Sequence, residues 1–357
     1  MTIRQTTLAL QRPTWLPTYL PELDGIRGVA ILAVVLYHCH PRLVGTPIYN
    51  ASLWGWAGVI LFFTLSGFLI TCILLETRNK PHYFHHFHAR RALRVWPVYL
   101  LVLAVVYLNA PWFVGGSVGH AIATAPWLAY IFCVQNLFHI TLPPALGPSW
   151  ALAIEEQYYF VWAPVVRWLR RPWMLASVLG AALVASPLIR RANLHWITPT
   201  HTLIHLDGIA LGSLLAIAFY TVKLSRRAWL AIGLAGLVVG IAAAATIAGG
   251  TAFLDSALAV GFAGAMVAAI ASTGARNPLN ALLRRGPLAF YGRISYGLYM
   301  THISVFIYFG WFDRAMDAYG IAGNLAVVGF RLVMCTLVAT ALWYGIESQI
   351  LKLKRFF

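Results

Sequence analysis

One uncharged stretch decides the fold class of this chain. Residues 53–75 read LWGWAGVILFFTLSGFLITCILL, without a single Asp, Glu, Lys or Arg. A run of about 20 apolar residues is long enough to cross the hydrocarbon core of a bilayer as an α-helix. Of the 357 residues, 60% are hydrophobic and only 10% are charged, whereas a soluble domain carries roughly a quarter charged residues. The sequence therefore predicts an integral membrane protein.

Similar apolar blocks recur along the chain on both sides of this stretch. The candidates lie near residues 23–41, 53–75, 95–114, 126–140, 150–169, 173–189, 201–222, 228–248, 253–271, 294–311 and 322–345. Backbone groups in lipid must be hydrogen-bonded within their own segment, which favours helices. No soluble domain and no internal repeat is evident between the blocks. We therefore expect residues 1–357 to form one all-α transmembrane domain.

The basic residues set the expected number of spans and their orientation. If the Pro-bounded block 126–140 is re-entrant rather than spanning, ten spans remain and both termini lie on the same side. Of the 26 Lys and Arg residues, 21 then fall on the inner side, as the positive-inside rule requires. Letting 126–140 span would move Arg167, Arg170 and Arg171 to the outer side. We expect about ten transmembrane helices, a re-entrant segment near 126–140, and cytoplasmic N- and C-termini.

Other classes of protein fit the sequence less well. The net charge of +16 invites a nucleic-acid interpretation, but the cations lie in short clusters between apolar blocks, so we expect no nucleic-acid partner. Residues 1–22 lack a small-residue cleavage pattern, which favours a retained first helix over a removed signal peptide. The cysteines are far apart and indicate neither a disulfide framework nor a zinc site: Cys39, Cys72, Cys133 and Cys335.

Ionisable residues inside the apolar blocks are candidates for function, because charges in lipid are costly. In the ten-span arrangement they gather toward the outer half: His38, His40, Glu155, Glu156, His205, Asp207, His302 and Arg331. The inner side instead carries Arg90, Arg91 and Arg94, just before Pro97. On a helix these three guanidinium groups share or adjoin one face, which suits phosphate binding.

Arg27 and His38 connect the two sides of the predicted bundle. They are eleven residues apart, which is about 16 Å along a helix. A phosphopantetheine arm reaches on the order of 15–20 Å by bond geometry. An acyl-CoA whose nucleotide is bound at the cytoplasmic arginines is therefore expected to present its thioester near His38.

At these residues the sequence resembles the acyltransferase-three family of membrane O-acyltransferases. Five motifs match in chain order: Leu23–Gly28 with Tyr37-His38, Phe62–Ile70, Phe87–Pro97, Ser149–Tyr159 and Ile294–His302. The departures are Ala151, Tyr158 and Met300, where the family usually has Ser, Phe and Leu. The chain is similar to the short members, which do not carry an extracytoplasmic hydrolase-like domain.

The resemblance implies a function and a location. Acetyl-CoA, or another acyl-CoA, is the expected donor substrate, and no cofactor is expected to be bound permanently. The expected acceptor is a hydroxyl of a carbohydrate or glycolipid at the extracytoplasmic face. The expected location is the bacterial cytoplasmic (inner) membrane, so the lipid bilayer is itself a partner. Acylation of a macrolide or a lipid-linked small molecule is an alternative, and a transporter or flippase is an alternative of a different class.

The resemblance also implies roles for individual residues. His38 is expected to act as the general base, because neutral imidazole titrates near working pH. Glu155 is expected to orient His38 or to bind the acceptor. Arg27, Arg90, Arg91 and Arg94 are assigned to the phosphates of the donor.

Four further residues are candidates for contacts with the acceptor: Ser149, Trp150, Tyr299 and His302. Trp150 has a ring on which a sugar can stack. Tyr299 and His302 lie on one helical face, where a packed polar pair and a pair of site residues are equally compatible with the spacing. The run His82, His85, His86 and His88 matches no defined metal-ligand spacing, so we expect no metal.

Overall fold

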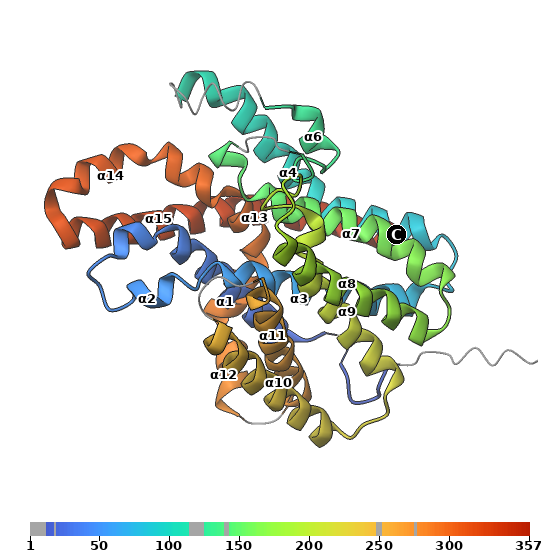
Figure 1. Ribbon diagram of the computed structural model, residues 1–357. Helices are drawn as coiled ribbons and strands as arrows, with labels where there is room; N and C mark the ends of the chain where they lie inside the picture. Colours follow the sequence, from blue (N-terminus) through green and yellow to red (C-terminus); the bar gives the residue numbers. More distant parts are fainter. Residues whose placement is uncertain (1–11, 18, 114–124, 139–142, 248–251, 275–276) are drawn as a thin grey trace, which may run out of the picture.

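The computed structural model describes residues 12–17, 19–113, 125–138, 143–247, 252–274 and 277–357 (Figure 1). Some sequence expectations fall outside these ranges. Arg4 and Arg276, two of the 21 cations expected on the inner side, lie outside the described residues. So do the last residues of the blocks 95–114 and 228–248, and residues 139–140 of the block 126–140. Within the described residues the chain is helical and contains no β-strand.

Long helices coincide with the apolar blocks. They are α1 (Pro21–His38), α3 (Ala57–Thr77), α4 (Tyr83–Phe113), α7 (Ser149–Trp168), α8 (Pro172–Ala192), α9 (Leu206–Thr221), α10 (Arg226–Ile247), α11 (Leu254–Ala271), α13 (Gly286–Tyr308) and α15 (Gly320–Leu342). The short helices are α2 (Tyr49–Ser52), α6 (Trp127–Ile131), α12 (Pro278–Leu283), α14 (Gly310–Met316) and α16 (Ser348–Leu351). A π-helical turn, Trp343–Glu347, follows α15.

Tight 3₁₀ turns complete the description of the helical segments. They are His40–Leu43, Pro144–Leu146, Thr202–Ile204, Asp317–Tyr319 and Lys352–Phe356. Such turns commonly end or connect α-helices. The turn His40–Leu43 follows α1. The apolar block near 23–41 is therefore an α-helix up to His38 and a 3₁₀ turn from His40.

Six segments of the described chain are long and apolar enough to cross a membrane. They are α3, Tyr83–Leu108 of α4, α8, α10, α11 and the continuous segment Gly310–Phe356 that contains α15. Three of the remaining long helices, α1, α7 and α13, carry the charged and polar residues of the expected site, and α9 has only 16 residues. The prediction of a multi-pass helical membrane protein is thus supported, while the number ten stays a prediction.

The block near 126–140 contains only the five-residue helix α6 among its described residues. Five residues span about 7.5 Å at 1.5 Å per residue, a quarter of a bilayer core. A crossing helix is therefore not present in the described part of this block. Its description as a re-entrant segment stays a prediction.

The periphery of the bundle is apolar, as contact with lipid requires. On α10, Val238 and Ile241 are 65% and 60% exposed, and on α15 Leu337 is 57% exposed. Helix α3 is the opposite case, since 67% of its apolar window is buried, against 17% for α10. Figure 1 accordingly shows α3 near the middle of the molecule and α10 at its lower edge.

Helices α1 and α13 approach each other closely in the centre of the molecule (Figure 1). A Cβ atom on Gly292 would lie 1.9 Å from the carbonyl oxygen of Asp24, and one on Gly28 would lie 2.1 Å from that of Leu288. Small residues at such positions let two helix backbones touch. His38 and His302 each follow their glycine by ten residues, so the same contact brings the two histidines together.

Side-chain contacts give the relative directions of the helices around this pair. Tyr83 of α4 donates a hydrogen bond to the carbonyl of Ala163 (3.0 Å), whereas Arg91, further along α4, lies 4.0 Å from Glu155, earlier in α7. These two helices are therefore antiparallel. The block near 126–140 lies between α4 and α7 in sequence. If this block does not cross the membrane, α4 and α7 are consecutive spans and must run in opposite directions, as they do here.

The contact between α1 and α13 predicts a specific sensitivity to one methyl group. Gly292→Ala should lower the free energy of unfolding by about 1–3 kcal/mol, because overpacking forces the backbones apart. Gly329→Ala on α15 is the matched control, since a Cβ atom there meets no heavy atom within 4 Å. Thermal unfolding in detergent measures both variants. Equal melting temperatures for the two would show that the α1–α13 contact tolerates a Cβ atom.

Candidate active site

Helix α1 carries Arg27 and His38 on nearly the same face. Eleven residues turn a helix through about 1,100°, which is 20° beyond three full turns. Because α1 is unbroken from Pro21 to His38, both side chains point to the same side of the bundle. They line two different cavities, which we call the arginine cavity and the histidine cavity.

The arginine cavity has a volume of about 100 Å³ and gathers residues from five helices. Its wall includes Arg27, Ser66, Arg91, Arg94, Glu155 and Tyr296. Two of its cations have carboxylate neighbours beyond hydrogen-bonding distance: Arg27 is 3.6 Å from Asp24 and Arg91 is 4.0 Å from Glu155. Their N–H groups are therefore available to an anionic ligand, for which guanidinium has a suitable fork of donors.

The arginine triad predicted from the sequence is divided in the structure. Arg91 and Arg94, three residues apart on α4, face the cavity, and the guanidinium of Arg91 also stacks 4.4 Å above the ring of Tyr159. Arg90 is exposed and does not line the cavity. The i, i+3 pair faces inward because α7 packs on that side of α4 through Tyr159. Arg90 does not contact the cavity, and its assignment to the phosphates of the donor stays a prediction.

Glu155 lies on the side of the arginines. Its carboxylate accepts hydrogen bonds from Ser66 (2.5 Å) and from the hydroxyl of Tyr159 (3.0 Å). Helix α7 begins at Ser149, so Glu155 is about 9 Å further along the axis, at the level of the arginine cavity. Among the described residues Glu155 has no contact with His38, and the predicted orienting role therefore finds no geometric support here.

The histidine cavity is larger, about 520 Å³, and its wall includes Tyr37, His38, Trp150, His205, Asp255 and His302. His38 and His302 form its central pair. Nε2 of His302 lies 3.3 Å from Nδ1 of His38, and the ring centroids are 4.8 Å apart. His302, which the spacing with Tyr299 left open between packing and function, is thus brought directly to the predicted base.

Hydrogen bonds determine which nitrogen of His38 carries the proton. Nδ1 of His302 lies 2.7 Å from the carbonyl oxygen of Tyr299, and a carbonyl can only accept, so Nδ1 is the donor and Nε2 is the acceptor in the neutral ring. Nδ1 of His38 faces that acceptor and the carbonyl of Val34 (2.9 Å). The proton of neutral His38 is therefore on Nδ1, which leaves Nε2 with a free lone pair, as a general base requires.

The two cavities adjoin. Val59, Phe63 and Tyr299 line both of them. These three side chains, which we call the neck, separate the arginines from the histidines. Tyr299, predicted as an acceptor contact, is therefore placed on the border between the cavities.

The other predicted acceptor contacts differ in their positions. Trp150 lines the histidine cavity, with its ring 6.0 Å from that of Phe63. Ser149 is fully buried, and its hydroxyl and carbonyl both accept hydrogen bonds from Gln135 at 3.1 Å. Ser149 lines neither cavity. Its observed partner anchors the preceding loop to the start of α7.

Two residues of the histidine cavity were not assigned from the sequence. His205 was noted only as an ionisable residue within an apolar block, and Asp255 was not singled out. Both line the cavity wall. Asp255 is the only charged residue in the block 253–271, which is the signal that could have identified it.

A bundle of apolar helices that encloses a cationic cavity next to a histidine cavity defines a class: multi-pass membrane proteins with an internal polar site. The comparison with known families is more specific. The sequence model described as an acyltransferase domain, that of the acyltransferase-three family, matches residues 20–344. The chain belongs to this family, and the resemblance drawn from its five motifs is confirmed.

Curated relatives point in the same direction. The chain is 28% identical to the peptidoglycan O-acetyltransferase of Listeria monocytogenes over 80% of its own length and 49% of that protein. It is 25% identical to the O-acetyltransferase of Staphylococcus aureus, over 94% of its length and 58% of that protein. A putative peptidoglycan O-acetyltransferase of Bacillus subtilis is 32% identical over 40% of this chain and 23% of that protein.

The chain spans about half the length of the first two relatives. No solved structure matches it. The match over residues 20–344 therefore establishes the family of this chain.

The histidine pair predicts a graded loss of acyl transfer. His38→Ala should abolish transfer, because it removes the lone pair on Nε2. His302→Ala should reduce kcat less, by about ten-fold, because it removes one of the two acceptors that face Nδ1 of His38 while the carbonyl of Val34 remains. Transfer by purified protein in nanodiscs measures both variants, with the exposed His85→Ala as control. A His302 variant with wild-type kcat would show that the pair only packs.

Proposed function

We propose that this chain is a membrane O-acyltransferase that moves an acetyl group from acetyl-CoA to a hydroxyl of a carbohydrate. The observation that carries the proposal is the pair of adjoining cavities, with Arg27 in one, His38 in the other, and both on one face of α1. The family match and the names of the curated relatives support the reaction class and a glycan acceptor.

The donor is assigned to the arginine cavity. Arg27, Arg91 and Arg94 provide N–H donors for the phosphates of CoA. The phosphopantetheine arm, on the order of 15–20 Å long, then extends through the neck toward His38, about 16 Å from Arg27 along α1. Glu155 lies beside Arg91, where it limits the excess positive charge around the arm.

The transfer step follows from the tautomer of His38. Nε2 takes the proton of the acceptor hydroxyl as the oxygen attacks the carbonyl carbon of the thioester. The carbon–sulfur bond breaks, the acetyl group stays on the oxygen as an ester, and the CoA thiolate leaves. The proton on His38 then returns to the thiolate or to water. The carbonyl of Val34 and Nε2 of His302 keep the proton on Nδ1 of His38 throughout.

The proposed topology has ten spans with cytoplasmic termini in the bacterial cytoplasmic membrane. The helix directions support this arrangement. Helices α1 and α13, the first and ninth spans, are parallel, since Gly28 packs near Gly292 and His38 near His302. Helices α3 and α7, the second and fourth, are also parallel, because Ser66 contacts Glu155 and Thr71 contacts Trp162. The arginine cavity then faces the cytoplasm and the histidine cavity the opposite side.

Purified protein in nanodiscs with radiolabelled acetyl-CoA tests the function. Label should appear in a soluble disaccharide fragment of peptidoglycan added as acceptor, and the ester should be released by mild base. Absence of label in the disaccharide, together with an unchanged concentration of acetyl-CoA, would refute both the donor and the reaction.

The division of the arginine triad predicts unequal effects on donor binding. Arg91→Ala should weaken acetyl-CoA binding by about ten-fold or more, since a charge-assisted hydrogen bond contributes roughly 1.5–3 kcal/mol. Arg90→Ala, the neighbouring exposed residue, should change the dissociation constant by much less. Isothermal titration in detergent compares the two. If both variants weaken acetyl-CoA binding equally, Arg90 belongs to the donor site, as the sequence predicted.

The neck predicts a variant that binds the donor and does not transfer. Val59→Trp fills the border between the cavities, so transfer to the disaccharide should fall by at least about ten-fold, a loss of roughly 1.4 kcal/mol of transition-state stabilisation. Acetyl-CoA affinity should persist because Arg27, Arg91 and Arg94 are unchanged. Ile73→Trp on the exposed side of α3 is the control. Undiminished transfer by the Val59 variant would exclude this route for the arm.

A further inference from the structure

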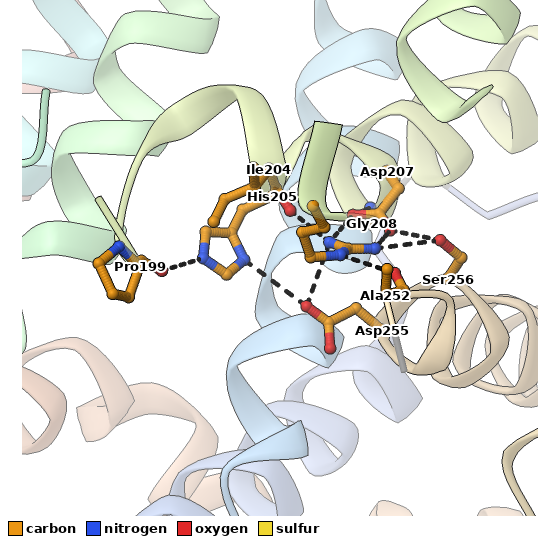
Figure 2. Close-up of polar contacts among 9 residues, drawn as sticks. Pro199, Ile204, His205, Asp207, Gly208, Ala252, Asp255 and Ser256 are labelled. Carbon is orange, nitrogen blue, oxygen red and sulfur yellow. Dashed lines mark hydrogen bonds and ion pairs between the residues drawn. The ribbon is translucent and has the colours of Figure 1, made fainter. Parts of the chain in front are cut away.

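A polar cluster at the ends of three helices adjoins the histidine cavity, and two of its members, His205 and Asp255, line the cavity wall (Figure 2). Arg190 of α8 lies at its centre, between Asp207 of α9 and Asp255 of α11. Its guanidinium donates to Asp207 Oδ2 at 2.6 Å and to Asp255 Oδ2 at 3.2 Å, and its Nε donates to the carbonyl of Ala252 at 2.8 Å. One guanidinium thus holds two carboxyl groups at fixed positions.

The two carboxyl groups differ in what surrounds them. Asp207 is 2% exposed, and Arg190, Ser256 (2.6 Å) and the backbone N–H of Gly208 (3.2 Å) hydrogen-bond to its two oxygens. Asp255 instead lines the histidine cavity. Its Oδ2 accepts from Arg190 at 3.2 Å and lies 3.7 Å from Nδ1 of His205, and no dashed line reaches its second oxygen in Figure 2. Asp207 therefore completes the packing of the cluster, whereas Asp255 presents an acceptor to the cavity.

His205 lies beside Asp255 and has a defined orientation. Its Nε2 lies 2.9 Å from the carbonyl of Pro199, so this nitrogen is the donor and Nδ1 holds the lone pair in the neutral ring. Nδ1 is 3.7 Å from Asp255 Oδ2, which is too far for a direct hydrogen bond. The wall therefore places an imidazole acceptor next to a carboxylate acceptor, and both side chains line the cavity.

An aromatic surface borders these acceptors. The ring of Trp150 lies 5.0 Å from that of His205 at an angle of 44°, and Phe63 lies 6.3 Å from His205. A sugar ring has apolar C–H faces that pack against aromatic rings and neighbouring hydroxyls that donate hydrogen bonds. With about 520 Å³, the cavity is within the range of small-molecule sites.

We propose that His205, oriented by the carbonyl of Pro199, and Asp255, held in place by Arg190, bind two neighbouring hydroxyls of a sugar ring that packs against Trp150. This inference rests on the proposed function, because it identifies the acceptor side of that site. His205 and Asp255 are acceptor-binding residues, and Arg190 is a positioning residue that acts through Asp255. The hydroxyls bound at this wall are neighbours of the one presented to His38, which lies on the same cavity.

The experiment measures two independent quantities for each variant in nanodiscs. The first is the KM for a soluble disaccharide fragment of peptidoglycan, with acetyl-CoA saturating. The second is equilibrium binding of the same disaccharide without donor, by tryptophan fluorescence. Asp255→Ala should raise both the KM and the dissociation constant by about ten-fold or more, the loss of one hydrogen bond to a charged group, and His205→Phe should raise both by roughly three- to ten-fold, the loss of one neutral hydrogen bond. The KM for acetyl-CoA should not change.

Asp255→Asn and Asp207→Asn complete the design. Asp255→Asn keeps the shape and should still raise the KM and the dissociation constant, even if the alanine variant does not fold. Asp207→Asn should instead lower the melting temperature, because its oxygens are fully engaged inside the cluster.

The outcomes separate this inference from the proposed function. Wild-type transfer with an unchanged disaccharide KM and dissociation constant in both Asp255 variants would overturn the subsite. No wild-type transfer, with disaccharide binding that Asp255→Asn weakens, would refute the function and keep the subsite. Failure of the wild-type protein to bind the disaccharide at all would also overturn the subsite.

Discussion

The contact between α1 and α13 is the constraint on which the site depends. Gly28 and Gly292 allow the two backbones to touch, and the histidines that follow in each helix meet as a direct consequence. Nε2 of His302 and the carbonyl of Val34 then both face Nδ1 of His38 and together determine the tautomer of the ring that faces the cavity. The geometry of the site therefore depends on the two glycines, which have no side chain, as much as on the two histidines.

Much of the fold was predictable from hydropathy, because lipid exposure imposes long apolar blocks, and each such block outside 126–140 coincides with a long helix. Helix ends were less predictable. Helix α13 begins at Gly286, eight residues before its block, because Arg293 interrupts the apolar run directly before residue 294. The residues of the site were recognisable by type and motif, but their partners were not. Glu155 contacts Tyr159 at i, i+4 spacing, but it contacts Ser66 of α3 because of the depth of α7 in the bundle, which no spacing within one helix reveals.

Asp255 is a second residue whose role depends on contacts between helices that the sequence does not reveal. It is one acidic residue at the start of an apolar helix, and such a position also suits the positive end of a helix dipole. Only the approach of α8 and α9, through Arg190 and Asp207, shows that it belongs to a cavity wall. Tertiary packing thus assigns a role that composition leaves open.

The neck of Val59, Phe63 and Tyr299 has a consequence for the cell as well as for the reaction. In the proposed orientation the arginine cavity opens toward the cytoplasm and the histidine cavity toward the outside. A continuous water-filled channel between them would let protons and ions leak across the membrane and dissipate its potential. Moving one elementary charge across 100 mV releases about 2.3 kcal/mol. The apolar and aromatic side chains that border both cavities therefore also insulate the two sides of the membrane from each other, while they have to admit the phosphopantetheine arm that carries the acetyl group.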